Sequence, residues 1–140
     1  MKKLILSLIA IFVFSFSFAQ SKKNISKKEL TTNAKKAVEY LKKELKLKGT
    51  KLTSVTKAFN EYAERMVSLN EKMSKKDESA EGNSEALVAN KKAKFKMMND
   101  FLKKRDADAT KGFSKKEIER YRKSARSIHP FTLRVKPIKK

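Results

Sequence analysis

The sequence predicts an all-α protein, with four helices in an elongated antiparallel hairpin arrangement, preceded by a signal peptide and followed by a short extended basic tail. Three observations support this fold class. The 140 residues contain only three Gly and two Pro, too few for the many turns of a β-sandwich. Apolar residues recur every three or four positions, as they do on one face of a helix. Two segments begin with a serine that is followed three residues later by a glutamate, which is the spacing of a helix-capping box.

The N-terminus has the features of a secretory signal peptide. Two lysines precede an apolar stretch over residues 4–16, and small residues follow it at Ser17 and Ala19. We therefore expect a signal peptide over residues 1–19 and a flexible leader over residues 20–25. The alternative is a retained membrane anchor, but roughly 16 apolar residues are fewer than the ~20 that span a bilayer. These features predict a periplasmic or secreted protein with no integral membrane span after cleavage.

The helical domain is predicted over residues 26–128. Its first helix is expected to begin at Ser26, where Glu29 completes the capping-box spacing, and to end at Gly49, which accepts the left-handed conformation. One apolar stripe, with lysines outside it, runs along this helix: Leu30, Ala34, Val38, Leu41 and Leu45.

The second helix has the most regular apolar spacing in the chain. Alternating steps of three and four residues join Leu52, Val55, Phe59, Tyr62, Met66, Leu69 and Met73. A seam of this kind requires a partner helix, and its length predicts a homodimer. The residues that follow, 74–84, are polar and contain Gly82-Asn83, which predicts a polar loop.

The third helix is expected over about residues 84–111, with Gly112 as its stop. Its apolar side is predicted to consist of Leu87, Phe95, Met98, Phe101 and Leu102. The middle of this helix is strongly basic, with four lysines between residues 91 and 96.

The fourth helix is expected to begin at Ser114, with Glu117 at capping-box spacing, and to end before Pro130. Residues 131–135 then alternate apolar and polar side chains, a pattern typical of extended backbone. We therefore expect an extended basic C-terminal tail over residues 129–140.

The composition disfavours catalysis. The chain has no Cys and one His, so it cannot form a disulfide, a thiol nucleophile, a Cys-ligated zinc site or a His-rich metal site. Asp106 and Asp108 stand two residues apart on a helix and point to different faces, which disfavours a metal site there. We interpret His129 as an ordinary helix-end residue; the alternative is a lone titrating switch. We expect neither enzyme activity nor a cofactor.

Positive charge is the main functional signal. The chain has 36 Lys and Arg against 15 Asp and Glu, a net charge of +21, and residues 113–140 are particularly basic. Such a field attracts polyanions and acidic proteins, whereas the simplest alternative is a solvated face. The signal peptide and the lack of a base-reading motif disfavour a sequence-specific nucleic-acid reader. The candidate client- or polyanion-binding residues are Lys91, Lys92, Lys94, Lys96, Lys115, Lys116, Arg120, Arg122, Lys123 and Arg126.

Short motifs before the second and fourth helices resemble those of the Spy/CpxP-like periplasmic proteins, which carry repeated Leu-Thr-x-x-Gln motifs. The matching positions are Leu47 and Lys51 in the first copy and Phe113, Ser114, Glu117 and Tyr121 in the second. Lys51 and Glu117 stand where the family pattern has glutamine, and Lys48 replaces the threonine of the first copy.

The resemblance covers about residues 28–128. It implies a thin, curved, all-helical protein that pairs into an antiparallel dimer and holds unfolded envelope proteins on a basic concave face without ATP. We therefore expect an exported chaperone-like or envelope stress-response protein, whose partners are unfolded or acidic envelope proteins held by charge and apolar stripes. The alternative is a polyanion-binding protein of the envelope or matrix, with nucleic acid, polysaccharide or an anionic surface as its partner.

Overall fold

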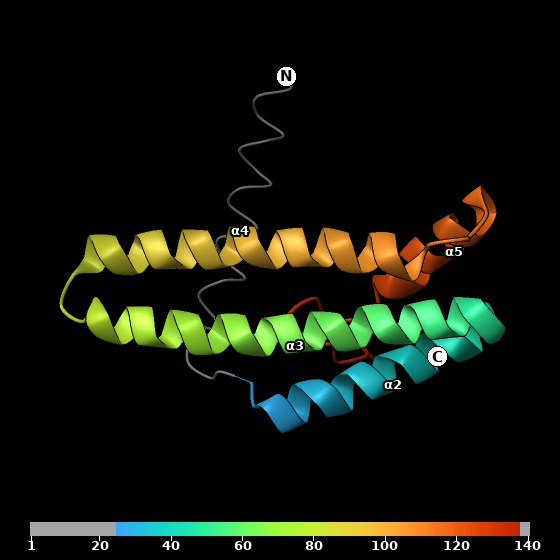
Figure 1. Ribbon diagram of the computed structural model, residues 1–140, viewed down its shortest axis with the longest axis horizontal. Helices are drawn as coiled ribbons and strands as arrows, with labels where there is room; N and C mark the ends of the chain where they lie inside the picture. The colour runs from blue at the N-terminus through green and yellow to red at the C-terminus, as the bar shows by residue number, and fades with distance from the viewer. Residues whose placement is uncertain (1–24, 138–140) are drawn as a thin grey trace, which may run out of the picture.

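A computed structural model describes residues 25–137, and the all-α fold class is confirmed (Figure 1). The described part of the chain forms α2 (Lys27–Leu45), α3 (Gly49–Ser79), α4 (Ser84–Ala109) and α5 (Lys115–Ala125). The signal segment over residues 1–19 and the leader up to residue 24 lie outside the described residues. Helices α3 and α4 lie antiparallel as the two longest elements, α2 packs along one half of α3, and α5 lies beside the end of α4 (Figure 1).

The two ends of α2 are capped in different ways. Ser26 caps the helix through its hydroxyl, which accepts the backbone N–H of Glu29 at 3.1 Å. The Glu29 carboxylate pairs with Arg134 from the C-terminal segment. The helix ends before the predicted stop at Gly49, because Lys46 already adopts the left-handed conformation with φ of 53°. Gly49, also left-handed, instead begins α3.

The polar stretch over residues 74–84 was predicted as a loop, and that prediction is wrong for most of its length. Helix α3 continues to Ser79, and the turn occupies only residues 80–83, with Gly82 at φ of 85°. Lys, Asp, Glu and Ser are compatible with a helix, so the polarity of this stretch marks exposure and not a break. Asp77 also ties the two helices together by accepting a hydrogen bond from Asn90 of α4 at 3.0 Å.

The apolar seam of α3 is covered within the chain. Six of its seven members are buried, and only Leu52 is half-buried. Helix α4 packs on one side of α3 and α2 on the other. The uncovered seam was the reason to expect a homodimer, and that reason does not hold, although dimer formation itself stays a prediction.

The C-terminal segment differs from the extended tail that the alternation predicted. It turns back on itself, so that Ile128 and Val135 form an antiparallel bridge. Leu133 at the turn has a φ of 57° and is fully buried. Residues 128–135 therefore belong to the packed domain, which extends past its predicted end at residue 128. The alternating pattern reflects one deeply inserted leucine and not a strand.

Within the described range, 25–137, no helix is long and apolar enough to cross a membrane.

Replacing Leu133 with Ala tests whether the C-terminal segment is part of the core. We expect the free energy of unfolding to fall by about 2–5 kcal/mol, the usual cost of emptying a buried leucine site. Urea denaturation followed by far-UV circular dichroism measures this. The exposed neighbour Lys136→Ala is the control and should change stability by no more than about 0.5 kcal/mol. Equal effects of the two substitutions would mean that the segment is not packed on the helices.

Candidate functional site

The two copies of the short motif meet in the structure. Lys51, from the start of α3, donates a hydrogen bond through Nζ to Oε1 of Glu117 on α5 at 2.5 Å. These are the two positions where the family pattern has glutamine. The Lys51 ammonium also lies 5.8 Å from the ring centroid of Phe113. Phe113 in turn contacts Tyr121 edge to face, with the ring centroids 6.3 Å apart. Leu47 lies in the hydrophobic core.

The predicted capping box at α5 is present. The Ser114 hydroxyl accepts the backbone N–H of Glu117, and the Glu117 carboxylate accepts the backbone N–H of Ser114 at 2.7 Å. The hydrogen bond from Lys51, followed by that from the Ser114 backbone, lowers the pKa of Glu117 to about 2. Because the folded state favours the charged carboxylate, its contribution to stability is present above the ordinary glutamate range and is lost only as the pH falls towards 2.

A buried arginine that was not predicted from the sequence is the centre of the polar packing. Arg105 of α4 is only 4% exposed, and its guanidinium lies 4.6 Å from the ring centroid of Phe59 and 5.1 Å from that of Tyr62. Aromatic faces attract cations, and the attraction is stronger away from water. A signal was available, because residue 105 continues the spacing of Met98 and Leu102 along the apolar side of the third helix.

Asp106 joins this arginine to α5. Its Oδ1 accepts hydrogen bonds from Nε and Nη2 of Arg105, at 3.0 and 2.8 Å, and from the hydroxyl of Tyr121 at 2.8 Å. Burial raises the pKa of Tyr121 far above its usual range. The phenol therefore stays a hydrogen-bond donor at any physiological pH. The motif tyrosine thus anchors α5 to the end of α4.

The predicted basic residues fall into two groups. The α5 group is Lys115, Lys116, Arg120, Arg122, Lys123 and Arg126, all exposed at the helix or its C-cap. In the α4 group, Lys91, Lys92 and Lys96 are exposed, whereas Lys94 is half-buried. Burial lowers the pKa of Lys94, an effect that the nearby Asp77 partly offsets. The two groups come from different helices and do not form one continuous run.

The structure adds a third set of exposed cations, which were not among the predicted binding residues. Lys35, Lys36, Lys42 and Lys43 are exposed on α2, on the side away from its buried stripe. Helix α2 contacts α5, so these lysines and the α5 group belong to neighbouring helices. We call the exposed cations of α2 and α5 together the basic face.

The two aspartates that were considered as a metal site, Asp106 and Asp108, make hydrogen bonds within the fold. Asp106 and Asp108 point in different directions, as their spacing predicted: Asp108 accepts a hydrogen bond from Lys104 at 2.9 Å, whereas Asp106 is turned to Arg105 and Tyr121. In the part of the chain that the structure describes, no three His, Cys, Asp or Glu side chains gather into a group that could hold a metal ion.

Comparison with known proteins found no match: no family model, curated protein or solved structure is significantly similar to this chain. The resemblance to the Spy/CpxP-like proteins therefore stays a hypothesis based on the motif residues.

Replacing Asp106 with Ala tests the role of the buried arginine. The substitution leaves the Arg105 charge buried without its carboxylate and removes the acceptor of Tyr121, so we expect a loss of at least ~2 kcal/mol in the free energy of unfolding. Asp108→Ala is a matched control, because the same residue type is removed two positions away from a surface pair with Lys104. It should cost no more than about 0.5 kcal/mol. Similar losses in the two variants would argue against the proposed role of Asp106.

Proposed function

We propose that the protein binds acidic polymers through its basic face, without catalysis and without a cofactor. The observation that supports this proposal most directly is the exposure of all six cations of the α5 group, on a helix that contacts the lysine-bearing α2. Lysine and arginine side chains that project into solvent can neutralise an anionic polymer and release its counterions. The net charge of +21 would also speed the encounter.

The distribution of apolar side chains favours this function over client holding along apolar stripes. The stripes of α2 and α3 are turned inward, and the α3 seam is almost completely buried against α4 and α2. A client could use them only after the helices separate. The lysines and arginines of the basic face, in contrast, are accessible in the folded chain.

A second candidate is the chaperone-like function suggested by the family resemblance. Two large apolar side chains on α4 are exposed, Val88 at 48% and Met97 at 36%. They flank the lysine-rich part of α4 along the chain. Charge could bring an unfolded acidic client close, and these side chains could then cover its apolar segments, each buried methylene contributing roughly 0.8 kcal/mol. In both candidates, the expected signal peptide would place the protein in the periplasm or outside the cell.

Binding to heparin and to duplex DNA tests the polyanion proposal. We expect affinity to fall steeply with salt and to be independent of DNA sequence. A variant with four cations replaced by Gln, at Arg120, Arg122, Lys123 and Arg126, should bind more weakly. The slope of log affinity against log salt should become shallower by about 0.9 for each DNA phosphate that the variant no longer neutralises. Fluorescence anisotropy over a salt series measures both quantities.

A variant with the same net charge is the control for that experiment. Replacing Lys57, Lys72, Lys75 and Lys76 with Gln removes four exposed cations of α3, which do not belong to the basic face. If this variant lost as much affinity as the α5 variant, net charge and not the basic face would be responsible. Much tighter binding to one DNA sequence than to scrambled duplexes would contradict the proposed class of function.

Suppression of aggregation tests the chaperone-like candidate. Light scattering from an unfolding client should fall at near-stoichiometric protein without ATP, and a Val88→Ser, Met97→Ser double variant should protect less because it removes the exposed apolar surface. Ala89→Ser with Ala93→Ser, at exposed positions of the same helix, is the control pair. Equal protection by lysozyme, a basic protein with no such role, would count against this candidate.

A further inference from the structure

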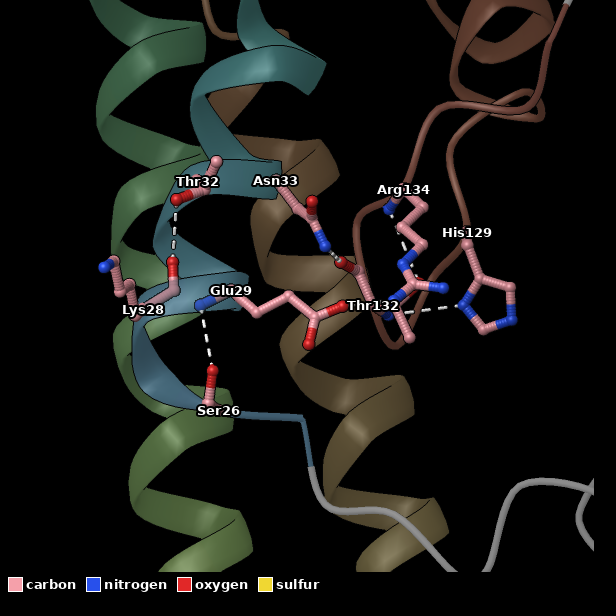
Figure 2. A network of polar contacts seen from close by, with 8 residues as sticks. All are labelled: Ser26, Lys28, Glu29, Thr32, Asn33, His129, Thr132 and Arg134. Carbon is pink, nitrogen blue, oxygen red and sulfur yellow. Dashed lines mark hydrogen bonds and ion pairs between the residues drawn. The ribbon is translucent and has the colours of Figure 1, made fainter.

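The C-terminal loop, residues 129–136, is held against the helices by polar contacts from two of them. The Asn33 side chain on α2 donates a hydrogen bond to the carbonyl of Thr132 at 2.8 Å (Figure 2). Tyr62 on α3 donates its hydroxyl proton to the carbonyl of Pro130. Arg134 pairs with Glu29 at the start of α2 (Figure 2). These bonds hold the loop so that Leu133 stays buried. The loop groups that make them are in position only while the turn inside the loop keeps its shape.

The side chain of His129 organises that turn. Its Nδ1 accepts hydrogen bonds from the backbone N–H groups of Phe131 and Thr132, both at 3.2 Å. Figure 2 shows the bond from Thr132. The backbone of His129 closes the same turn, with its N–H bonded to the carbonyl of Arg134 at 2.8 Å and its carbonyl to the N–H of Leu133 at 2.9 Å. Two donors face Nδ1, so this nitrogen must carry a lone pair, and the neutral ring has its proton on Nε2.

We propose that His129 is a pH-sensitive latch: when Nδ1 takes up a proton in mild acid, the loop over residues 129–136 detaches from α2 and α3. A protonated Nδ1 is a donor that faces two backbone donors, so both hydrogen bonds break at once. This inference does not depend on the polyanion-binding or chaperone-like function proposed above.

Burial and two nearby positive charges favour the neutral form of the His129 ring. Burial lowers the pKa of His129, and the nearby Lys136 and Arg134 charges lower it further. On α4, Phe95 contacts Phe131 of the loop, and Lys91 stands one turn before Phe95. Glu29 of α2 pairs with Arg134 of the loop. Tyr62 of α3 also contacts the loop, and burial raises its pKa to about 12, so it stays neutral.

The direction of the pH effect follows from the lowered pKa. The closed loop binds the neutral imidazole, whereas the open loop exposes an imidazole with the ordinary pKa of about 6.5. The stabilisation of the closed loop is therefore complete above about pH 6.5 and is lost as the pH falls towards the lowered value in the closed state. Protonation would release a loop that carries Arg134 and Lys136 and would uncover the site filled by Leu133.

Backbone NMR and amide hydrogen exchange between about pH 7.5 and about pH 5 test the latch. Carboxyl groups ordinarily titrate near 4, so this range leaves them charged. In the wild-type protein, exchange of the Leu133 amide reports the opening constant of the loop, once the intrinsic pH dependence of exchange is corrected for. This constant should rise by up to about tenfold per pH unit below about 6.5. The helical circular dichroism signal should stay unchanged, which separates loop release from general unfolding.

Two variants make the experiment specific. In His129→Asn, the side-chain Oδ1 stands where Nδ1 stood and accepts the same N–H groups but does not titrate, so the loop should stay closed over the whole range. In His129→Ala, the acceptor is missing, so the loop should open more often than in the wild type at pH 7.5, and its opening should not change with pH. A wild-type loop that stays equally protected at low pH, an Asn variant that opens with acid as the wild type does, an Ala variant as well protected as the wild type at pH 7.5, or a His129 that titrates at or above 6.5 would each overturn the proposal.

Discussion

Burial of the apolar stripe of α3 is the constraint on which the rest of the structure depends. The helix is 31 residues long, and most helical stability in proteins comes from packing such an apolar face. Helix α4 covers one side of the stripe and α2 the other, and the C-terminal loop reaches it through the hydroxyl of Tyr62. Helix α2 is shorter than α3 and covers only one half of it. Towards the turn between α3 and α4, these two helices therefore continue as a pair (Figure 1). The elongated shape follows from the different lengths of the helices that share this one stripe.

The covering helix α4 is itself poor in buried apolar side chains, and its polar residues do part of the packing. Met98 and Ala109 are its buried apolar members, and Arg105 fills the position between them. A guanidinium can occupy this place because it stacks on two aromatic rings and because the neighbouring Asp106 supplies a countercharge. Tyr121 then attaches α5 to the same carboxylate. The placement of α5, and with it part of the basic face, therefore depends on hydrogen bonds and charge as well as on apolar contact.

The sequence was sufficient to predict the four helices, the cap at Ser114 and most of the core, because period and capping are local properties. It misjudged residues 74–79, since polarity reports exposure and a solvent-facing helix is as polar as a loop. It misjudged residues 131–135 because the buried Leu133 sits in a left-handed turn whose stability comes from bonds to α2 and α3. Arg105 was missed because a charged residue is normally assigned to the surface, although its spacing placed it on the buried side. The pairing of Lys51 with Glu117 joins positions 66 residues apart, and no local pattern indicates such a contact.

The two kinds of packing have different consequences for function. Apolar contacts between α3 and its neighbours are indifferent to pH and salt over the ordinary range, so the hairpin is a fixed support. The basic face and the C-terminal loop depend on charges and hydrogen bonds, which respond to both conditions. Among residues 25–137, only Val88 and Met97 are exposed large apolar side chains, so the surface that these residues present to a partner is predominantly cationic. The loop that carries Arg134 and Lys136 is also the last element to cover α2 and α3, and its turn is organised by the single histidine of the sequence. The proposed latch would therefore change the surface at this loop, while the helices that support the basic face stay in place.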